Sequence, residues 1–377
     1  MKKFSKPIPY MRNNIDKATK NLVIDVLDNQ LITQGKYVEL VENKMSELNN
    51  KKFSIMTANG TASLHLVAHM LKNKSNIKKP NIITTPLTFV ADANFGRYIN
   101  ADVKFADIDK HTWTISSKSV ESLVDENTLA IVAPHFAGLM FEAENMRKVA
   151  KKFNITLVED ACHAPNAIRD GFRAGGVGDL STFSFHATKH IGAGEGGLIS
   201  TNSEEEYFEL STLRSHGLPH WSKRTGFGYD INELAFNYRP NEIAAAIAYN
   251  HILNLNELID LRIKIAQIYD KNLDFSFFQK QQIPNKSTHV YHLYPILVPS
   301  KDLRSKFLSF LKDANIFAQI HYPAINKMTG FLMYNSNTPI SDDITERIVS
   351  IPIFPTLTEA EQGFVVEKIN EFAKINC

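Results

Sequence analysis

Residues 181–201 have the sequence STFSFHATKHIGAGEGGLIST, and this segment carries the most structural information in the chain. Its apolar start is typical of a buried strand, and the glycines between residues 192 and 197 are typical of a turn. Lys189 lies between the two. A lysine held there loses hydration, which lowers its pKa toward that of a nucleophilic amine, as a Schiff-base lysine requires. The alternative is a surface lysine that caps a loop.

Short apolar runs alternate with helical patterns from about residue 50 to 200. Representative runs are SIMT at 54–57, LAIVAP at 129–134 and ITLVED at 155–160. Near-continuous apolar strands separated by helices are typical of a largely parallel sheet covered on both faces. The fold class is therefore predicted to be α/β, with functional groups at the carboxyl ends of the strands.

A smaller unit is predicted at the C-terminal end. The pattern at residues 242–273 keeps a helical period over more than the length of an ordinary globular helix, so we expect it to bridge two units. Two strand patterns and two helical patterns follow, at residues 288–299, 316–322, 302–314 and from Glu359 onward. We therefore expect a large domain at residues 1–250, with an N-terminal arm, and a small α+β domain at residues 251–377.

Composition excludes several classes of function. The 377 residues include 42 Lys+Arg and 40 Asp+Glu, so the net charge of +2 provides no basic field that would collect nucleic acid. The most apolar stretch, residues 129–141, is too short to cross a membrane. No apolar stretch follows the basic first residues, which argues against a secretory signal and for the cytoplasm. Cys162 and Cys377 have neither disulfide nor metal spacing.

Two segments are candidates for binding a phosphate and a planar ring. In TANGTASLHL, residues 57–66, Gly60 and Thr61 open a helix whose free N–H groups would suit a phosphate, although this segment alone favours a simple capped turn. In TPLTFVADAN, residues 85–94, Phe89 follows a strand end and could stack on a cofactor ring. The alternative for Phe89 is a place in the core.

Two further segments carry polar groups at strand or helix ends. In ITLVEDACHAP, residues 155–165, Asp160 could keep a heteroaromatic nitrogen protonated through a charge-assisted hydrogen bond. His163 is expected to pack beside the ring or orient Asp160, because a metal site lacks further ligands at useful spacing. In FNYRPNEIAAAI, residues 236–247, Asn237 suits anion or dimer contacts, and a capping turn is the alternative.

Taken together and in this order, these segments resemble the fold-type I pyridoxal phosphate enzymes, specifically the DegT/DnrJ/EryC1/StrS sugar aminotransferase family. The resemblance covers essentially the whole chain through motifs such as NGTASLHL, TTPLTFVADAN, VEDACHA, FSFHATK, GEGG and FNYRPNE. It implies a mostly parallel central sheet with helices on both faces, pyridoxal 5'-phosphate as the cofactor and no metal.

The resemblance also implies roles for single residues. Lys189 would carry the cofactor as a Schiff base, and Asp160 would pair with the pyridine nitrogen. The ring would lie between Phe89 and the side of His163. The cofactor phosphate would be held by Gly60, Thr61, Ser184 and, from the partner subunit of a homodimer, Asn237. The nucleotide-sugar site would be lined by Tyr10, Gln30, Leu31, Ile32, Thr33, His321 and Tyr322.

A narrower likeness concerns the substrate. ITQGK, RSHG, HLYPIL and FAQIHY resemble the members that act in pseudaminic acid biosynthesis. These members move an amino group from L-glutamate to the C4 keto group of a UDP-linked 4-keto-6-deoxy-N-acetylhexosamine. Members acting on other ketosugar nucleotides, of the GDP-perosamine, bacillosamine or dTDP-sugar type, share several of these features and stay open as alternatives.

Two single positions depart from the family pattern, and so does the turn at residues 190–194, which has the sequence HIGAG where GTG or TTG is common. Ala187 stands where a proline is usual, which changes backbone stiffness alone. Asp92 stands where an apolar or hydroxyl residue is more familiar and leaves substrate preference open. Two hypotheses of other classes are a nicotinamide oxidoreductase, for which no GxGxxG follows an early strand, and a non-catalytic regulator or scaffold that retains the fold.

Overall fold

The computed structural model describes residues 3–29, 31–220, 230–231 and 233–376. Within them lies a seven-stranded sheet in which β9 runs antiparallel to both adjacent strands and the other neighbours are parallel. In spatial order the strands are β1 (Phe53–Thr57), β9 (Gly197–Thr201), β8 (Leu180–Ser184), β5 (Thr156–Asp160), β4 (Thr128–Pro134), β2 (Asn81–Thr84) and β3 (Asp102–Phe105). The predicted α/β class with a mostly parallel sheet is confirmed.

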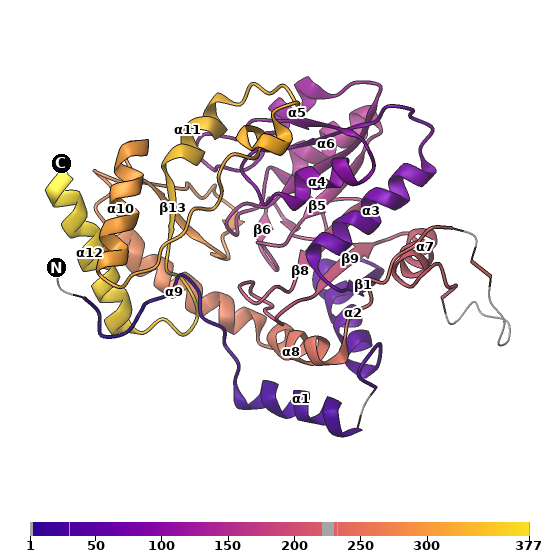
Figure 1. Cartoon of the computed structure of the whole chain (residues 1–377), viewed down its shortest axis with the longest axis horizontal. Coiled ribbons are helices and arrows are strands. Elements are labelled where there is room, and N and C mark those ends of the chain that lie inside the picture. Colours follow the sequence, from indigo (N-terminus) through magenta and orange to yellow (C-terminus); the bar gives the residue numbers. More distant parts are fainter. Residues whose placement is uncertain (1–2, 30, 221–229, 232, 377) are drawn as a thin grey trace.

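Both faces of this sheet are covered by helices (Figure 1). Successive strand side chains enter two separate cores, as Ile82 and Val158 do on one face and Ile83 and Leu157 do on the other. The first core includes α3 (Gly60–Lys74), α4 (Ala91–Tyr98) and α7 (Glu204–Arg214). The second includes α1 (Lys17–Asn29), α2 (Lys36–Asn49), α5 (Ser117–Leu123), α6 (Ala143–Phe153) and α8 (Glu242–Leu253). Burial on both faces explains why the strand sequences are near-continuous apolar runs.

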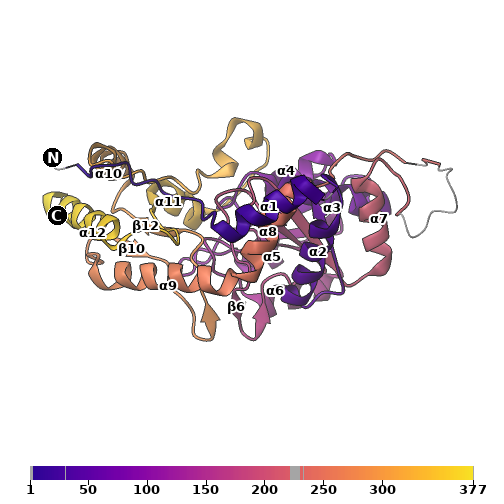
Figure 2. The same cartoon turned by 90° about the horizontal axis from the view of Figure 1, so that it is seen from below.

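The long helical pattern forms two helices rather than one. α8 ends at Leu253, and α9 (Leu255–Asn272) begins after Asn254, whose ψ of 13° departs from the α-helical value. The Asn254 side-chain amide donates to the Asn250 carbonyl at 2.9 Å, a local bond that competes with helix continuation. The expectation of one unbroken helix is therefore wrong. Figure 2 shows α9 extending from the large sheet toward the C-terminal elements.

The C-terminal elements surround a second, smaller sheet. Its strands, in spatial order, are β10 (Gln279–Lys280), β12 (Tyr294–Leu297) and β13 (Ile348–Ile351). It packs with α10 (Lys301–Asp313), α11 (Pro339–Arg347) and α12 (Glu359–Asn376). Short elements complete the described chain: β6 (Ile168–Arg169), β7 (Phe172–Arg173), β11 (Ser287–Thr288), η2 (Ile325–Lys327) and η3 (Thr329–Phe331). The domain division at residue 250 stays a prediction.

Residues near the N-terminus belong to the core of these C-terminal elements. Ile8 is fully buried in it and forms a parallel bridge with Ile316. Gln319 forms a second isolated bridge, with Ser350. The strand expected at residues 316–322 is therefore wrong, because the segment pairs at single positions and not along a continuous ladder. Among the described helices, none combines the length and the hydropathy needed to cross a membrane.

Candidate active site

A cavity of about 750 Å³ opens at the carboxyl ends of β1, β4, β5 and β8. This is the edge at which a parallel sheet presents functional groups. Of the residues predicted from sequence, its wall contains Tyr10, Gly60, Thr61, Phe89, Asp160, His163, Ser184, Lys189, His321 and Tyr322. The fold thus brings together side chains that are far apart in the sequence.

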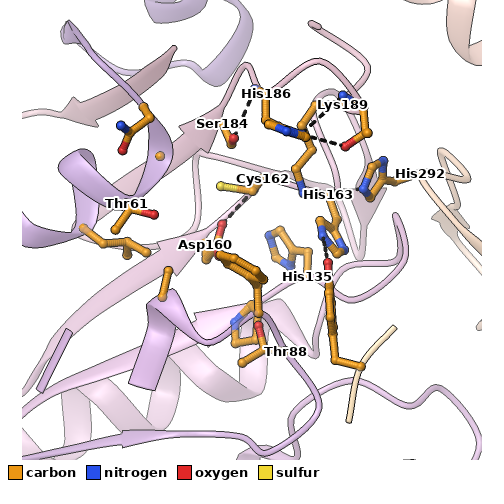
Figure 3. Close-up of a pocket in the computed structure, with 18 of the residues that line it drawn as sticks. Thr61, Thr88, His135, Asp160, Cys162, His163, Ser184, His186, Lys189 and His292 are labelled. Carbon is orange, nitrogen blue, oxygen red and sulfur yellow. Dashed lines mark hydrogen bonds between the residues drawn. The ribbon is translucent and has the colours of Figure 1, made fainter. Parts of the chain in front are cut away.

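Lys189 lies on the turn after β8, where its N–H donates to the carbonyl of His186 at 2.8 Å. Burial lowers the pKa of Lys189 below its ordinary value, although Cys162 and Asp160 act in the opposite direction. Its Nζ is 3.4 Å from Nε2 of His292. Figure 3 shows both side chains on one side of the cavity and Thr61 on the other. Lys189 is therefore a half-buried residue of the cavity wall rather than a surface lysine, and its lowered pKa brings the ammonium and the neutral amine closer in free energy.

Asp160 is the last residue of β5 and reaches the cavity with 9% of its surface exposed. Its Oδ1 accepts a hydrogen bond from the N–H of Cys162 at 2.8 Å, which fixes the carboxyl group. Glu159 points the other way, into the core, where His135 lies 2.7 Å from it. Among the residues that the structure describes, no group of three or more His, Cys, Asp or Glu side chains could hold a metal ion.

The start of α3 forms a cradle beside the end of β8. Asn59 caps the helix by accepting from the N–H of Ala62 at 2.8 Å. A Cβ added to Gly60 would lie 2.9 Å from Cβ of Ser184, and one added to Gly197 would lie 2.4 Å from the carbonyl carbon of Asn59. Glycine at both positions therefore allows the strand and the helix start to touch. The cradle offers the Ser184 hydroxyl and the first N–H groups of a helix, a donor set that suits a phosphate.

His163 is held as a neutral ring. Its Nδ1 accepts from the N–H of Ala137 at 3.3 Å, so Nε2 carries the proton and donates to the Tyr322 hydroxyl at 3.1 Å. Burial holds the pKa of His163 well below its ordinary value, in agreement with this assignment. Phe89 is 53% exposed and lies 6.0 Å from Tyr322 between ring centres, so it is not a core residue. These rings form an aromatic wall of the cavity.

A comparison of the chain with models of protein families shows which family it belongs to. The model of the DegT/DnrJ/EryC1/StrS aminotransferase family matches residues 13–370. The chain belongs to this family. It is therefore a pyridoxal phosphate-dependent aminotransferase, and the alternatives of a nicotinamide oxidoreductase and a non-catalytic scaffold do not fit this assignment.

Three relatives of this aminotransferase are informative. GDP-perosamine synthase of Escherichia coli O157:H7 is 29% identical, over 97% of this chain and 99% of its own. The UDP-4-amino-4,6-dideoxy-N-acetyl-beta-L-altrosamine transaminase of Campylobacter jejuni is 30% identical, over 96% of both chains. The solved structure of Helicobacter pylori PseC, an aminotransferase of pseudoaminic acid biosynthesis, is 28% identical with a TM-score of 0.92, over 98% of this chain and 100% of that one.

The residues of the cavity fit pyridoxal phosphate. The cradle of Gly60 and Ser184 is a close approach that a Cβ at position 60 would fill, and its donors match a phosphate. Asp160 offers an acceptor for a protonated ring nitrogen, and Lys189 offers an amine with a lowered pKa. The phosphate, ring and aldehyde portions of the cofactor therefore each have a chemically matched group in the wall.

Several predicted residues lie away from this cavity. Asn237 is exposed and pairs with Ser215 in an isolated bridge, outside the cavity of its own chain. Leu31 and Ile32 are 72% and 56% exposed, and neither they nor Thr33 line the cavity. Gln30 lies outside the described residues. The geometry of a single chain therefore leaves the predicted roles of these residues as proposals.

Two motifs that are far apart in the sequence, ITQGK at residues 32–36 and RPNE at residues 239–242, contact one another. The Glu242 carboxylate, on the first turn of α8, accepts from the N–H groups of Gly35, Tyr37 and Val38 at 2.6, 2.7 and 3.0 Å. It thereby satisfies the free donors at the start of α2. The Glu242 N–H also donates to the carbonyl of Ile32 at 2.8 Å. The ITQGK and RPNE motifs thus fix one another, although neither enters the cavity.

Sequence reasoning assigned no role to His292, although it quoted the motif HLYPIL that contains it. Burial holds the pKa of His292 well below its ordinary value, so the ring is neutral beside Lys189. The contact joins residues 103 positions apart. No local pattern connects such residues, so the fold had to be known before the pair could be recognised.

Proposed function

We propose that this aminotransferase moves an amino group from L-glutamate to the C4 keto group of a UDP-linked 4-keto-6-deoxy-N-acetylhexosamine. The observation that carries the chemistry is Lys189, an amine with a lowered pKa in the cavity wall that also contains Asp160. The choice of sugar is supported by the 30% identity to the Campylobacter jejuni altrosamine transaminase over nearly the whole chain. A cytoplasmic location stays a prediction.

The cofactor would be held by its two ends. Ser184, Gly60 and Thr61 would bind the phosphate through a hydroxyl and the N–H groups of a helix start. Asp160 would accept a hydrogen bond from the ring nitrogen, and Phe89 and the neutral His163 would contact the ring faces. Pyridoxal phosphate, once bound, supplies a ring that withdraws electrons from the reacting carbon.

Proton transfer would belong to Nζ of Lys189. As a neutral amine it would take a proton from the reacting carbon of the amino donor, and as an ammonium it would deliver one to C4 of the sugar. His292 has a neutral Nε2 at 3.4 Å, which would accept a hydrogen bond from that ammonium. The lowered pKa of Lys189 favours both directions because it brings the two protonation states closer in free energy.

The sugar would lie against Tyr10, His321 and Tyr322, which form the side of the cavity nearest the C-terminal elements. A second subunit would complete the site. We propose a homodimer in which Asn237 of one chain reaches the cofactor phosphate of the other. Its exposure, together with the exposed apolar Leu31 and Ile32, supports this part of the proposal.

A substrate panel tests the proposal. Purified protein is given L-glutamate and a set of UDP-, GDP- and dTDP-linked ketosugars, and the aminated product is identified by mass and NMR. We expect the UDP-linked 4-keto-6-deoxy-N-acetylhexosamine to give the highest kcat/KM and a C4 amine. A GDP-linked sugar as the best substrate, which the 29% identity to GDP-perosamine synthase makes the second candidate, would overturn the choice of sugar.

A further inference from the structure

Asp92, on the first turn of α4, is a carboxyl group with no access to solvent. The hydroxyl of Thr88 donates to its Oδ2 at 2.5 Å. Its Oδ1 is also buried, and no N–H or O–H group of the described residues donates to it. An ionised carboxylate in this position would leave one oxygen without hydration or a donor, which is costly inside a protein.

The carboxyl groups of Asp92 and Asp160 lie within hydrogen-bonding reach of one another. Two ionised carboxylates have acceptors only, so a hydrogen bond between them requires that one carries a proton. Like charges this close in a buried place cannot both stay ionised, as in carboxyl pairs that share a single proton. The geometry therefore calls for a pair with one proton and a single negative charge.

The surroundings show which carboxyl holds the proton. Asp160 accepts from the N–H of Cys162 at 2.8 Å and lines the cavity, so its charge has a donor and reaches the cavity. Asp92 has neither solvent nor a place in the cavity wall. Burial, followed by the charge of Asp160, raises the pKa of Asp92 well above its ordinary value.

The other titratable neighbours of Asp92 do not move the shared proton from Asp92 to Asp160. Lys189 lowers the pKa of Asp92, but by less than burial and Asp160 raise it. Cys162 and Tyr322 also face Asp92, and burial raises the pKa of each, so both are neutral. The first turn of a helix favours negative charge only weakly compared with full desolvation.

We propose that Asp92 is a positioning residue: it remains a neutral carboxylic acid whose O–H donates to the carboxylate of Asp160. The inference rests on the proposed role of Asp160 toward the cofactor nitrogen. With the Cys162 N–H and the Asp92 O–H as donors, the Asp160 carboxylate is fixed in orientation and keeps lone pairs free for that nitrogen.

Infrared difference spectroscopy of the full chain with bound cofactor, at neutral pH, detects this proton directly. A protonated carboxylic acid has a C=O band distinct from those of ionised carboxylates, and the band shifts in D₂O. We expect a band in the wild type that is lost in Asp92→Asn and kept in Asp102→Asn, a control that removes an exposed carboxyl on β3. No such band in the wild type, or its survival in Asp92→Asn, would overturn the proposal.

Asp160→Asn provides a second infrared test, which is needed if Asp92→Asn does not fold. If Asp92 holds the proton, the band persists in Asp160→Asn and shifts, because its acceptor is no longer charged. If the band disappears, the proton belongs to Asp160 and the proposal is wrong. These readouts do not depend on turnover, so a protein that shows the band but transfers no amino group would contradict the proposed function alone.

A kinetic comparison tests the hydrogen bond itself. Asp92→Asn keeps an N–H donor and should retain turnover within roughly threefold, whereas Asp92→Leu should lose roughly tenfold, the equivalent of one charge-assisted hydrogen bond. The pH dependence of the bound cofactor's absorbance should shift in Asp92→Leu and not in Asp92→Asn. Equal turnover and equal spectra for both variants would exclude a donor role for Asp92.

Discussion

At the scale of single residues, loss of hydration disfavours the charged form of three basic groups in the cavity. It lowers the pKa of Lys189 and holds the pKa of His163 and His292 well below their ordinary values, so the rings stay neutral beside the amine. A neutral ring neither repels a protonated Lys189 nor competes with it for the negative charge of Asp160. These directions support the proposal that Lys189 is the amine that transfers the proton.

Lys189→Ala should therefore remove the visible absorbance of the bound cofactor and lower turnover by roughly a thousandfold or more, the scale of general acid–base catalysis. The measurement is an absorbance spectrum of purified protein followed by a glutamate half-reaction. Lys118→Ala, which removes an exposed lysine on α5, is the matched control. Full turnover in Lys189→Ala would contradict the role proposed for this amine.

A second residue-scale prediction concerns stability and pH. Burial alone would raise the pKa of Glu159, but hydrogen bonds from His135 and from the N–H groups of Gly175 and Gly178 lower it overall. A lowered folded-state pKa contributes stability above the unfolded-state value near 4.5, and this stability is lost as pH falls through the folded-state pKa. Glu159→Gln should cost about 2 kcal/mol or more at neutral pH.

Urea unfolding at several pH values measures this difference. The difference in the free energy of unfolding between wild type and Glu159→Gln should become smaller as the solution becomes more acidic than pH 4.5. Glu126→Gln, which changes an exposed carboxyl, should stay within about 0.5 kcal/mol of the wild type. A gap that does not change with pH would show that the charge of Glu159 does not stabilise the fold.

At the scale of secondary-structure elements, the cavity depends on the contact between the start of α3 and the end of β8. Glycine makes that contact possible, because a Cβ at position 197 would collide with the backbone at Asn59. The glycine-rich segment after Lys189 is therefore a packing requirement as well as a turn. The distance between the strand and the helix start sets the size of the phosphate cradle.

Gly197→Ala should separate these elements. We expect a loss of about 1–3 kcal/mol in the free energy of unfolding, together with a cofactor affinity lower by roughly tenfold. Thermal melting and a titration followed by cofactor absorbance provide the two values. Gly363→Ala is the control, since α12 has open space there and alanine should stabilise by about 0.5–1 kcal/mol.

Local sequence was sufficient to predict a helix or strand wherever that element depends on its own residues. The strand before Lys189 and the capped start of α3 were predicted because apolar runs and caps act over a few positions. The prediction of a strand at residues 316–322 failed because a strand needs a partner along its length, and this segment has bridges at single positions only. Asn254 lies at the break in the long helix, where its side chain makes hydrogen bonds to Asn250 that hydrophobic periodicity does not reveal.

At the scale of the whole molecule, one described chain does not contain every residue that the proposed site requires. Asn237 and Thr33 lie outside the cavity, although the ITQGK and RPNE motifs are fixed to one another by Glu242. That shared, rigid attachment would let both motifs be presented together to a second copy of the chain. The family resemblance implied a shared site, and this arrangement supports that proposal, which sequence periodicity alone could not provide.

Dimers formed from two different mutant chains test the proposal of a site shared between subunits. Lys189→Ala and Asn237→Ala chains should each be inactive or weak alone. After unfolding and refolding together, half of the dimers would be mixed and each would hold one complete site, so activity should reach about one quarter of wild type. A mixture no more active than the sum of its parts, or full activity of Asn237→Ala alone, would contradict a site shared between subunits.

The burial of Ile8 against Ile316 also has a consequence for synthesis on the ribosome. Phe4 packs against Phe364, so the smaller core is closed by residues 360 positions apart, and the earlier segment is synthesised long before the later one. The early segment must wait without its packing partner while 360 further residues are synthesised, at a rate of about 5–20 per second. Chaperone binding to a nascent chain should accordingly concentrate on this waiting segment.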